Sequence, residues 1–472
     1  QKNKIIFANY MGMGYGCNCK YVVEQLLKNP NKYELVWVVK DVASNANYIP
    51  PNIRLVEYMS EEAFMEYATA GIWICNYHLV AYLNKGLQKK EGQIYIQLWH
   101  GSFGIKKIEG DCRNLVIDRN WEYLAKKNAD LTDIWISNSD FETRIYKRAF
   151  WNVKNIKEYG HPRNDIFFTK YDRIIKKVKK ELGISFESKM VLYVPTFRDN
   201  GQYEGEYLDS EMVVGKLEER FGNNWEFVVR YHPKAEFREN QMKIGINATN
   251  YPDIQELLAA ADTVITDYSS CIFDFLLTGR PGFIYTTDSD MYGEIRGLYY
   301  PLKETPFMVA ENNKQLCENI DRFDEKEYEK RVKQFLNDKG SVEDGHAAER
   351  LEGLIKRLVR NEKMKKYLKT FWNRRFLLSE LVKKGVKLKY RRSYLGVCWS
   401  LLEPLLTTCV LTIVFGTLFG NNSRDFPMYI LCGRLLYTFF SQATKTAARS
   451  IRANSKMICK VYVPKYLYPL SC

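Results

Sequence analysis

The sequence predicts an α/β protein in which two doubly wound parallel sheets are followed by a helical membrane segment. Three observations lead there. Short apolar runs alternate with helical patterns through residue 300, and a break near residues 160–169 divides this region into two halves of similar size. Farther on, residues 397–419 contain a single charged side chain, Glu403. The 472 residues suffice for about two to four domains of ordinary size.

Nine short apolar runs are predicted to be strands, because Gly, Pro, Asn or Asp bounds most of them, as in buried parallel strands. They are residues 5–8, 35–39, 72–75, 94–98, 134–136, 191–194, 226–230, 264–266 and 282–285. Helical patterns between them cover residues 22–27, 61–70, 140–149, 171–182 and 254–261. Two such halves facing each other predict a cleft, with the ligand at the carboxyl ends of the strands.

The C-terminal part has a different character. Residues 311–360 are charged and predicted to be helical, and residues 363–392 interleave basic with apolar side chains. This second pattern favours a helix on an anionic membrane surface, with a solvated charged helix as the alternative. A helix over 397–419 would reach about 35 Å, enough to cross a hydrocarbon core of about 30 Å. A buried helix of a soluble domain is the alternative there.

A second span is predicted from residue 427 to about residue 448, although Arg434 and Lys445 weaken it. Basic residues flank the pair of spans on both sides. Because positive flanks stay on the cytoplasmic side, we expect a cell-membrane protein whose catalytic domains lie on the cytoplasmic face.

The net charge of +14 belongs to this C-terminal part. Residues 363–472 contain twenty Lys or Arg and three acidic residues, a net charge of +17, which leaves −3 for residues 1–362. A near-neutral main body argues against nucleic acid as a partner. The composition also excludes a disordered or disulfide-scaffold protein, and eleven cysteines without a C-x-x-C pair fit reduced thiols.

The first candidate motif follows the predicted strand 94–98 and contains His100. A histidine at the carboxyl end of a strand faces the cleft and can accept a proton from an attacking hydroxyl. Small neighbours let a ligand approach closely. The four residues that follow His100 in the chain are also predicted to contact the ligand: Gly101, Ser102, Phe103 and Gly104. Packing of His100 at a sheet edge is the alternative.

Two further motifs follow the strands 191–194 and 226–230. The first supplies Pro195, Thr196 and Arg198, a turn with a hydroxyl and a guanidinium. The second supplies Arg230, Tyr231 and His232. Since Arg230 and His232 are two residues apart, extended backbone would direct both to the same side, which suits a diphosphate. Ion pairing with nearby acids is the alternative for Arg198.

A fourth motif follows the strand 264–266 and includes Ser269, Ser270 and Asp274. Either serine can cap the helix predicted after it, and a helix N-terminus offers free N–H groups to an anion. Four such motifs at strand ends together predict a phosphate-bearing ligand. We expect no metal site, because Asp288 and Asp290 have no second cluster of ligands, and no dinucleotide site, because Gly12, Gly14 and Gly16 lack the required spacing.

Residues 1–355 resemble the CDP-glycerol glycerophosphotransferases, the primases and polymerases of teichoic acid. The strings that carry the resemblance are GYGCNCKY, QIYIQLWHGSFGIKKIEGD, HPRNDIF, VPTFRD, RYHP and TDYSSCIFDF. The resemblance implies two Rossmann-like domains of the GT-B kind. It also implies a CDP-polyol donor, with CMP released as phosphoglycerol passes to a lipid-linked acceptor hydroxyl in teichoic acid biosynthesis. No cofactor is implied.

Position by position, the resemblance implies that His100 is the catalytic base. His232, which we also expect to be catalytic, and Arg230 match the pair that contacts the donor phosphates. The donor-binding positions match Arg163, Pro195, Thr196, Ser269, Ser270 and Asp274.

Residues from about 371 to 472 resemble another family, the permease subunits of polysaccharide and teichoic-acid ABC exporters. The strings are KYRRSYLGVCWSLLEPLL, DFPMYILCGRLLYTFFSQA and NSKMICKVYVPKYLYPLS. They match the amino-terminal part of such a permease, so we expect a truncated one. An ATP-binding exporter subunit is then a further expected partner, since the sequence has no P-loop motif of its own.

These observations predict an N-terminal acceptor-side domain at 1–165, a CDP-polyol-binding domain at 166–355, a basic amphipathic linker at 356–395 and a partial permease at 396–472. The expected activity is glycerophosphotransfer from CDP-glycerol. The alternatives are a component of an ABC exporter and a GT-B glycosyltransferase that uses a nucleotide sugar. Glycerol, ribitol and other polyols remain open as the donor's polyol.

Overall fold

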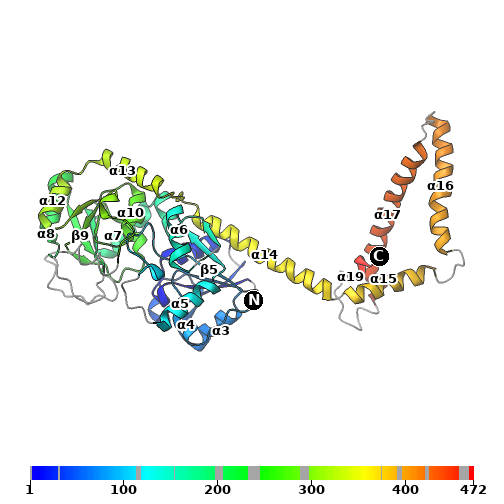
Figure 1. Cartoon of the computed structure of the whole chain (residues 1–472), viewed down its shortest axis with the longest axis horizontal. Coiled ribbons are helices and arrows are strands. Elements are labelled where there is room, and N and C mark those ends of the chain that lie inside the picture. The colour runs from blue at the N-terminus through cyan, green and yellow to red at the C-terminus, as the bar shows by residue number, and fades with distance from the viewer. Residues whose placement is uncertain are drawn as a thin grey trace. The chain divides into compact units, whose positions relative to one another are not determined.

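The computed structural model describes residues 3–29, 32–112, 119–151, 153, 155–196, 206–231, 245–287, 297–373, 375–390, 396–419, 425–455 and 467–471. The chain divides into two compact units, residues 1–360 and residues 361–472, which are described separately (Figure 1).

The first unit contains a seven-stranded sheet whose paired strands are all parallel. Its order is β3-β2-β1-β4-β5-β6-β7, in which the winding reverses between β1 and β4. The strands are β1 (Lys4–Ala8), β2 (Glu34–Val39), β3 (Arg54–Glu57), β4 (Ile72–Cys75), β5 (Ile94–Gln97), β6 (Ile134–Ser137) and β7 (Ile156–Glu158).

A second, six-stranded parallel sheet follows in the same unit, in the order β10-β9-β8-β11-β12-β13. Its winding reverses between β8 and β11. The strands are β8 (Lys189–Val194), β9 (Trp225–Val229), β10 (Ile246–Asn247), β11 (Thr263–Thr266), β12 (Gly282–Tyr285) and β13 (Met308–Ala310). The prediction of an α/β fold with doubly wound parallel sheets is confirmed.

Helices connect the strands of both sheets (Figure 1). The α-helices of this unit are α1 (Cys17–Leu27), α2 (Val42–Asn45), α3 (Glu61–Thr69), α4 (Val80–Asn84), α5 (Arg119–Leu131), α6 (Asp140–Ala149), α7 (Asp172–Leu182), α8 (Ser210–Phe221), α9 (Ile254–Ala260), α10 (Cys271–Phe275), α12 (Asn313–Asp321) and α13 (Glu325–Asp338). Single 3₁₀ turns are η1 (Tyr10–Gly12), η2 (Glu109–Asp111), η5 (Leu276–Thr278) and η6 (Leu302–Glu304), and η3 (Pro162–Phe168) is longer. Helix α14 (Ala347–Asn373) contains the boundary between the units.

All nine predicted strands are present, within two residues of their predicted ends. The four strands that the sequence did not predict are β3, β7, β10 and β13, the outermost strands of the two sheets. An outer strand is buried less completely, so its sequence need not be a continuous apolar run. Strands β7 and β10 illustrate this, since their residues are intermediate or exposed.

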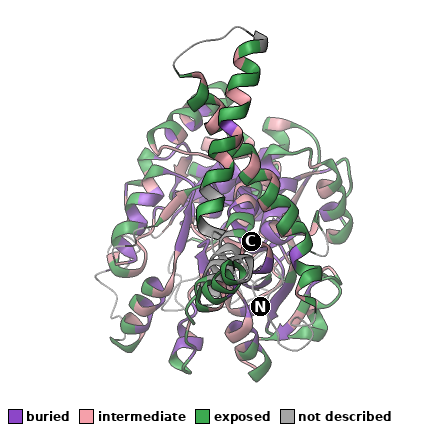
Figure 2. Cartoon of the chain, turned by 90° about the vertical axis from the view of Figure 1, so that its right-hand side faces the viewer, coloured by how far each residue is buried: buried purple, intermediate pink, exposed green. Residues whose placement is uncertain are grey.

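Both faces of the central strands are buried, as the purple strands in Figure 2 show. In β1, Ile5 and Phe7 belong to one apolar cluster, and Ile6 and Ala8 belong to another. Alternate side chains of a strand point to opposite faces, so the two clusters are the cores above and below the first sheet. The second sheet has a core of its own. These cores fix the carboxyl ends of the strands, where the candidate site lies.

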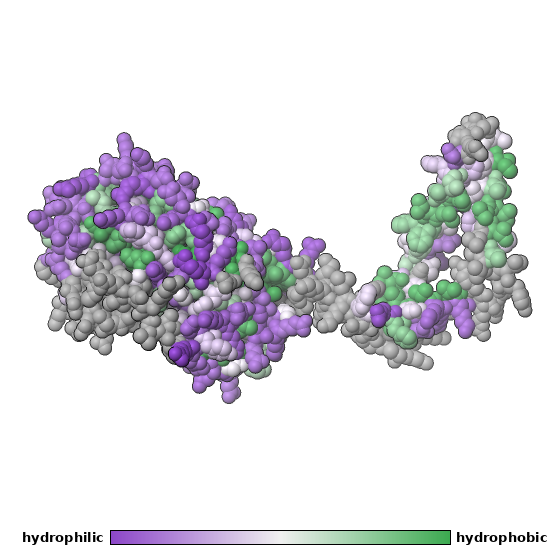
Figure 3. Space-filling view, in the orientation of Figure 1, coloured by the Kyte–Doolittle hydropathy of each residue, from purple (hydrophilic) through white to green (hydrophobic). Residues whose placement is uncertain are grey.

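The second unit is helical. After the end of α14 come α15 (Arg375–Tyr390), α16 (Gly396–Phe419), α17 (Phe426–Ala453) and α19 (Leu467–Leu470). A small apolar cluster contains Leu381, Leu467 and Tyr468. Figure 3 shows hydrophobic side chains on the surface of α16 and α17, and Ile413 and Phe439 are among those exposed.

The two predicted membrane spans coincide with α16 and α17. Within the described residues, however, no helix combines the length and the apolar character that crossing a membrane requires. The structure therefore does not support the prediction of spanning helices at 397–419 and 427–448. Pro404 lies inside α16 next to Glu403, and α17 contains the charged residues Arg434 and Lys445.

Candidate active site

A cleft of about 300 Å³ lies between the two sheets of the first unit. Its lining comes from the carboxyl ends of strands in both sheets: Tyr10 follows β1, His100 follows β5, Thr196 follows β8 and Arg230 follows β9. In doubly wound sheets, ligands bind outside the carboxyl ends of the strands where the winding reverses. Both β1 and β8 border such a point, so the cleft is where this architecture predicts a ligand.

Most of the predicted site residues meet in this cleft. Those that line it are His100, Arg163, Pro195, Thr196, Arg230, Tyr231, Ser269, Ser270 and Asp274. Gly101, Ser102, Phe103 and Gly104 do not line it and form the loop behind His100. His232 and Arg198, together with Asp288 and Asp290, lie outside the described residues.

His100 is half-buried at the end of β5, with the rings of Tyr10 and Trp99 at 4.6 and 4.2 Å from its own. Its Nδ1 lies 2.8 Å from the Asn76 carbonyl oxygen. A carbonyl can only accept, so Nδ1 carries the proton and Nε2 keeps its lone pair. Burial lowers the pKa of His100 to about 3, which keeps the imidazole neutral at pH 7. This tautomer is the one that a proton acceptor needs.

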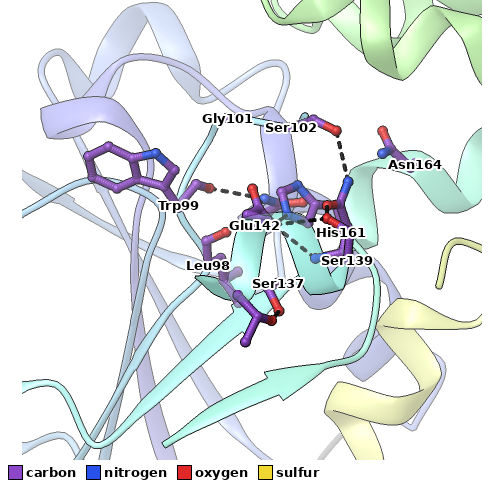
Figure 4. Close-up of polar contacts among 12 residues, drawn as sticks. Leu98, Trp99, Gly101, Ser102, Ser137, Ser139, Glu142, His161 and Asn164 are labelled. Carbon is purple, nitrogen blue, oxygen red and sulfur yellow. Dashed lines mark hydrogen bonds and ion pairs between the residues drawn. The ribbon is translucent and has the colours of Figure 1, made fainter. Parts of the chain in front are cut away.

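The loop that follows His100, residues 101–104, is held by hydrogen bonds and has buried side chains at Ser102 and Phe103. Ser102 is buried and accepts a hydrogen bond from the Asn138 amide at 2.8 Å (Figure 4). The backbone N–H of Asn138 donates to Glu142 at 2.8 Å, and the same carboxylate lies 2.8 Å from His161 Nε2. Phe103 is buried in the core of the second half. The side chains of Ser102 and Phe103 are buried in the protein interior and do not line the cleft, so the structure does not support the prediction that they contact the ligand.

Arg163 and Asp274 were predicted as donor-binding residues, and the structure pairs them with each other. Arg163 Nε and Nη2 donate to the two carboxylate oxygens of Asp274 at 2.9 and 3.2 Å, and both side chains are buried. Nη2 also donates to the Gly101 carbonyl at 2.8 Å. Burial alone would lower the pKa of Arg163, but Asp274 raises it well above its usual value. Arg163 thus links the His100 loop to the second half.

Unlike Arg163, Arg230 is not paired with a carboxylate of a described residue. Its Nη1 donates to the Tyr251 carbonyl at 2.8 Å, and no carboxylate of a described residue forms an ion pair with it. Burial lowers the pKa of this guanidinium, a cost that a bound anion would offset. Arg230 is therefore the better placed of the two arginines for a phosphate group.

The turn after β8 is tied to the turn after β11. The backbone N–H of Thr196 donates to Asp267 at 2.9 Å, and the Thr196 hydroxyl donates to the same carboxylate. The backbone N–H of Tyr268 donates to it at 2.6 Å. Asp267 therefore holds both turns in place at the wall of the cleft.

Ser269 and Ser270 line the cleft, but the predicted helix cap needs correction. Ser270 is the residue before α10 and makes no capping hydrogen bond, and Ser269 Oγ lies 3.5 Å from the Cys271 N–H. Helix α10 has five residues, too few for a strong dipole. The two hydroxyls, rather than a helix N-terminus, are what this wall offers to an anion.

Some residues of the cleft were not predicted from the sequence: Asn9, Tyr10, Cys17, Lys106, Asp253, Gln255 and Cys271. The places of Cys17, Asp253 and Gln255 depend on how α1 and α9 pack. Lys20 on α1 is buried and forms ion pairs with Asp253 at 2.8 Å and Glu256 at 2.6 Å, and the Tyr21 hydroxyl donates to Asp253 at 2.9 Å. The string GYGCNCKY at residues 14–21 was the available signal for Cys17, because it contains the first residues of α1.

Several non-glycine residues around the cleft have left-handed backbone. Tyr10, Cys17, Trp99 and Phe103 have φ of 40°, 53°, 50° and 29°. Such conformations cost free energy and gather at functional sites, where neighbouring contacts hold them. The turn at Trp99 directly precedes His100.

Two parallel, doubly wound sheets around a cleft with this polar lining are a GT-B-like architecture. The chain belongs to the CDP-Glycerol:Poly(glycerophosphate) glycerophosphotransferase family, whose model matches residues 1–357.

Curated relatives are similar to this chain over most of its length. A Teichoic acid glycerol-phosphate transferase of Staphylococcus aureus is 30% identical over 74% of this chain and 92% of its own length. A Teichoic acid poly(glycerol phosphate) polymerase of Bacillus spizizenii is 28% identical over 74% of this chain and 90% of its own. Against a polymerase of the same name from Staphylococcus epidermidis, also 28% identical, the chain spans about half the relative's length, 51%.

Among solved structures, the Wall Teichoic Acid Polymerase TagF superposes with a TM-score of 0.67 at 26% identity. The match covers 77% of this chain and 90% of that one. A TagF variant soaked with CDPG superposes with the same TM-score, at 25% identity.

Proposed function

We propose that this protein is a CDP-glycerol glycerophosphotransferase that transfers phosphoglycerol to an acceptor hydroxyl and releases CMP, in the biosynthesis of teichoic acid. The observation that carries the proposal is the pairing, across one cleft, of a neutral proton acceptor, His100, with a guanidinium, Arg230, that forms no ion pair with a carboxylate of a described residue. Membership of the family and the likeness to TagF support the choice of donor.

In the proposed reaction, His100 Nε2 takes the proton of the acceptor hydroxyl. The acceptor oxygen bonds to the phosphorus that carries glycerol, and the bond from this phosphorus to the bridging oxygen breaks. CMP leaves with the electron pair of that bond. Arg230 and the hydroxyls of Ser269 and Ser270 stabilise the charge on the phosphates as CMP leaves.

The experiment is to incubate the chain with CDP-glycerol, CDP-ribitol and UDP-sugars in the presence of a lipid-linked acceptor. We expect CMP release from CDP-glycerol, and the length of the product tells a primase from a polymerase. If CMP were released from CDP-ribitol and not from CDP-glycerol, ribitol would replace glycerol as the polyol of the donor. UDP release from a sugar donor would replace the proposal by glycosyl transfer.

We further infer that the second unit attaches the enzyme to the membrane, with the catalytic unit on the cytoplasmic face. Exposed apolar side chains on α15 to α17, among them Phe376 and Tyr437, support this proposal together with the net charge of +17 in residues 363–472. Flotation with vesicles that contain anionic lipid tests it. We expect co-flotation that weakens in vesicles of zwitterionic lipid, and absence of co-flotation would contradict the proposal.

The resemblance of residues 371–472 to exporter permeases supports a related proposal, that the second unit assembles with an ATP-binding exporter subunit. Co-purification from membranes tests it. Recovery of the chain without an ATP-hydrolysing partner would contradict it.

A further inference from the structure

We propose that Asn18 is a positioning residue for His100. This inference rests on the proposed function, since it assigns a role to a residue that supports the proposed base. Asn18 is the second residue of α1 and is fully buried, and it does not line the cleft. It therefore acts on the site through other residues.

The amide nitrogen of Asn18 holds the end of β5. Nδ2 donates to the carbonyl oxygens of Leu98 at 3.2 Å and Trp99 at 3.0 Å. Trp99 has left-handed backbone with φ of 50°, and the next residue is His100. A non-glycine residue keeps such a conformation only when its surroundings hold it. The two hydrogen bonds from Asn18, together with the one that the Trp99 N–H donates to Gln97 Oε1 at 3.0 Å, provide this hold at the turn that directs the imidazole.

The amide oxygen of Asn18 binds the other side of the same loop. Oδ1 accepts the backbone N–H of Arg163 at 3.1 Å, and Arg163 Nη2 donates to the Gly101 carbonyl at 2.8 Å. Asn18 and Arg163 thus close a ring of hydrogen bonds around residues 98–101. His100 belongs to this segment, and the carbonyls bound by Asn18 precede it in the chain while the one bound by Arg163 follows it.

This placement separates Asn18 from the groups that do the chemistry. The imidazole itself is held by Asn76, and Arg230 contacts the Tyr251 carbonyl on the opposite wall. Loss of the Asn18 amide would leave the base and the anion-binding groups present but would misdirect His100. A misplacement of about 1 Å can cost about 100-fold in rate, so the expected loss is in kcat.

The test is Asn18→Asp, which preserves the size of the side chain and its acceptor for the Arg163 N–H but removes the donor to Leu98 and Trp99. We expect kcat to fall about 10- to 100-fold at pH 8, with KM for CDP-glycerol changed less than about threefold. A protonated carboxyl can donate again, and burial raises the pKa of a carboxyl. The kcat of the variant should therefore rise as the pH is lowered to 5.

The matched control is Asn313→Asp. Asn313 is a buried asparagine of the second half that does not line the cleft, and its Nδ2 donates to the Tyr207 carbonyl at 2.9 Å while its Oδ1 accepts the Asp209 N–H at 2.8 Å. It carries the same chemical change without touching residues 98–101. We expect an unchanged kcat and no recovery at low pH. Asn18→Ala, with the same loss of kcat and no acid recovery, provides the comparison if the buried carboxylate prevents folding.

A second readout does not depend on transfer. In protein with ¹⁵N-labelled histidine, the signal of His100 is assigned by its absence in His100→Ala. This signal should shift in Asn18→Asp and keep its position in Asn313→Asp. An unshifted signal, an unchanged kcat, or a rise in KM alone would overturn the positioning role. If the unsubstituted chain releases no CMP from any CDP-polyol, the proposed function fails, and the histidine signals still decide the role of Asn18.

Discussion

The two walls of the cleft differ in chemistry. The wall from the first sheet places His100 among aromatic rings and fixes its tautomer through a backbone carbonyl. The wall from the second sheet offers a guanidinium and hydroxyls, from Arg230, Ser269 and Ser270. A base must be neutral before it accepts a proton, and burial keeps His100 neutral, whereas an anion site needs donors. In the proposed function, one wall activates the acceptor and the other binds the donor.

Loss of the base gives the largest expected effect and tests the first wall. His100→Ala should lower kcat about 10²- to 10⁴-fold, because the acceptor hydroxyl loses its proton acceptor. The measurement is CMP release from CDP-glycerol. His346→Ala, which changes an exposed histidine bonded to Glu349, serves as the control and should keep its turnover. Turnover of His100→Ala near that of the control would contradict the assignment.

Arg163→Met tests the link between the walls. It leaves Asp274 buried without its partner, which should lower the free energy of unfolding by about 3–5 kcal/mol. Chemical denaturation measures the loss. The double variant with Asp274→Asn should recover a part of it, since no unpaired charge then remains. Equal stability of the single and double variants would contradict the pairing.

Arg230→Gln sharpens the contrast with Arg163. We expect kcat/KM for CDP-glycerol to fall about 10- to 150-fold, the loss of charge-assisted hydrogen bonds of about 1.5–3 kcal/mol. Stability should change little, because no ion pair to a described carboxylate is broken. Steady-state kinetics and a melting curve measure the two effects. A large loss of stability with unchanged kinetics would reverse the roles given to the two arginines.

The smallest expected effect is the response to pH. Since burial lowers the pKa of His100 to about 3, the free enzyme keeps its neutral base down to that region. The base is lost only as the pH falls through the lowered pKa, so kcat/KM should show no acid limb due to His100 between pH 8 and 5. A limb near the usual histidine pKa of about 6.5 that disappears in His100→Ala would show that the imidazole is not held as described.

The sequence predicted the central strands because they are continuous apolar runs, and it missed β3, β7, β10 and β13 because outer strands need no such run. It also predicted nine of the residues that line the cleft, most of them in the turns that follow strands. It could not predict that Arg163 pairs with Asp274, 111 residues away, nor that Ser102 turns inward to Asn138. Those outcomes depend on packing between elements that are distant in the chain.

The central claim, that the two walls divide activation of the acceptor from binding of the donor, is tested most directly by titrating CDP-glycerol into His100→Ala in a calorimeter. We predict a dissociation constant within about threefold of the unsubstituted protein, because the donor-binding groups on the second wall are unchanged. Loss of binding in this variant would contradict the division of roles between the walls.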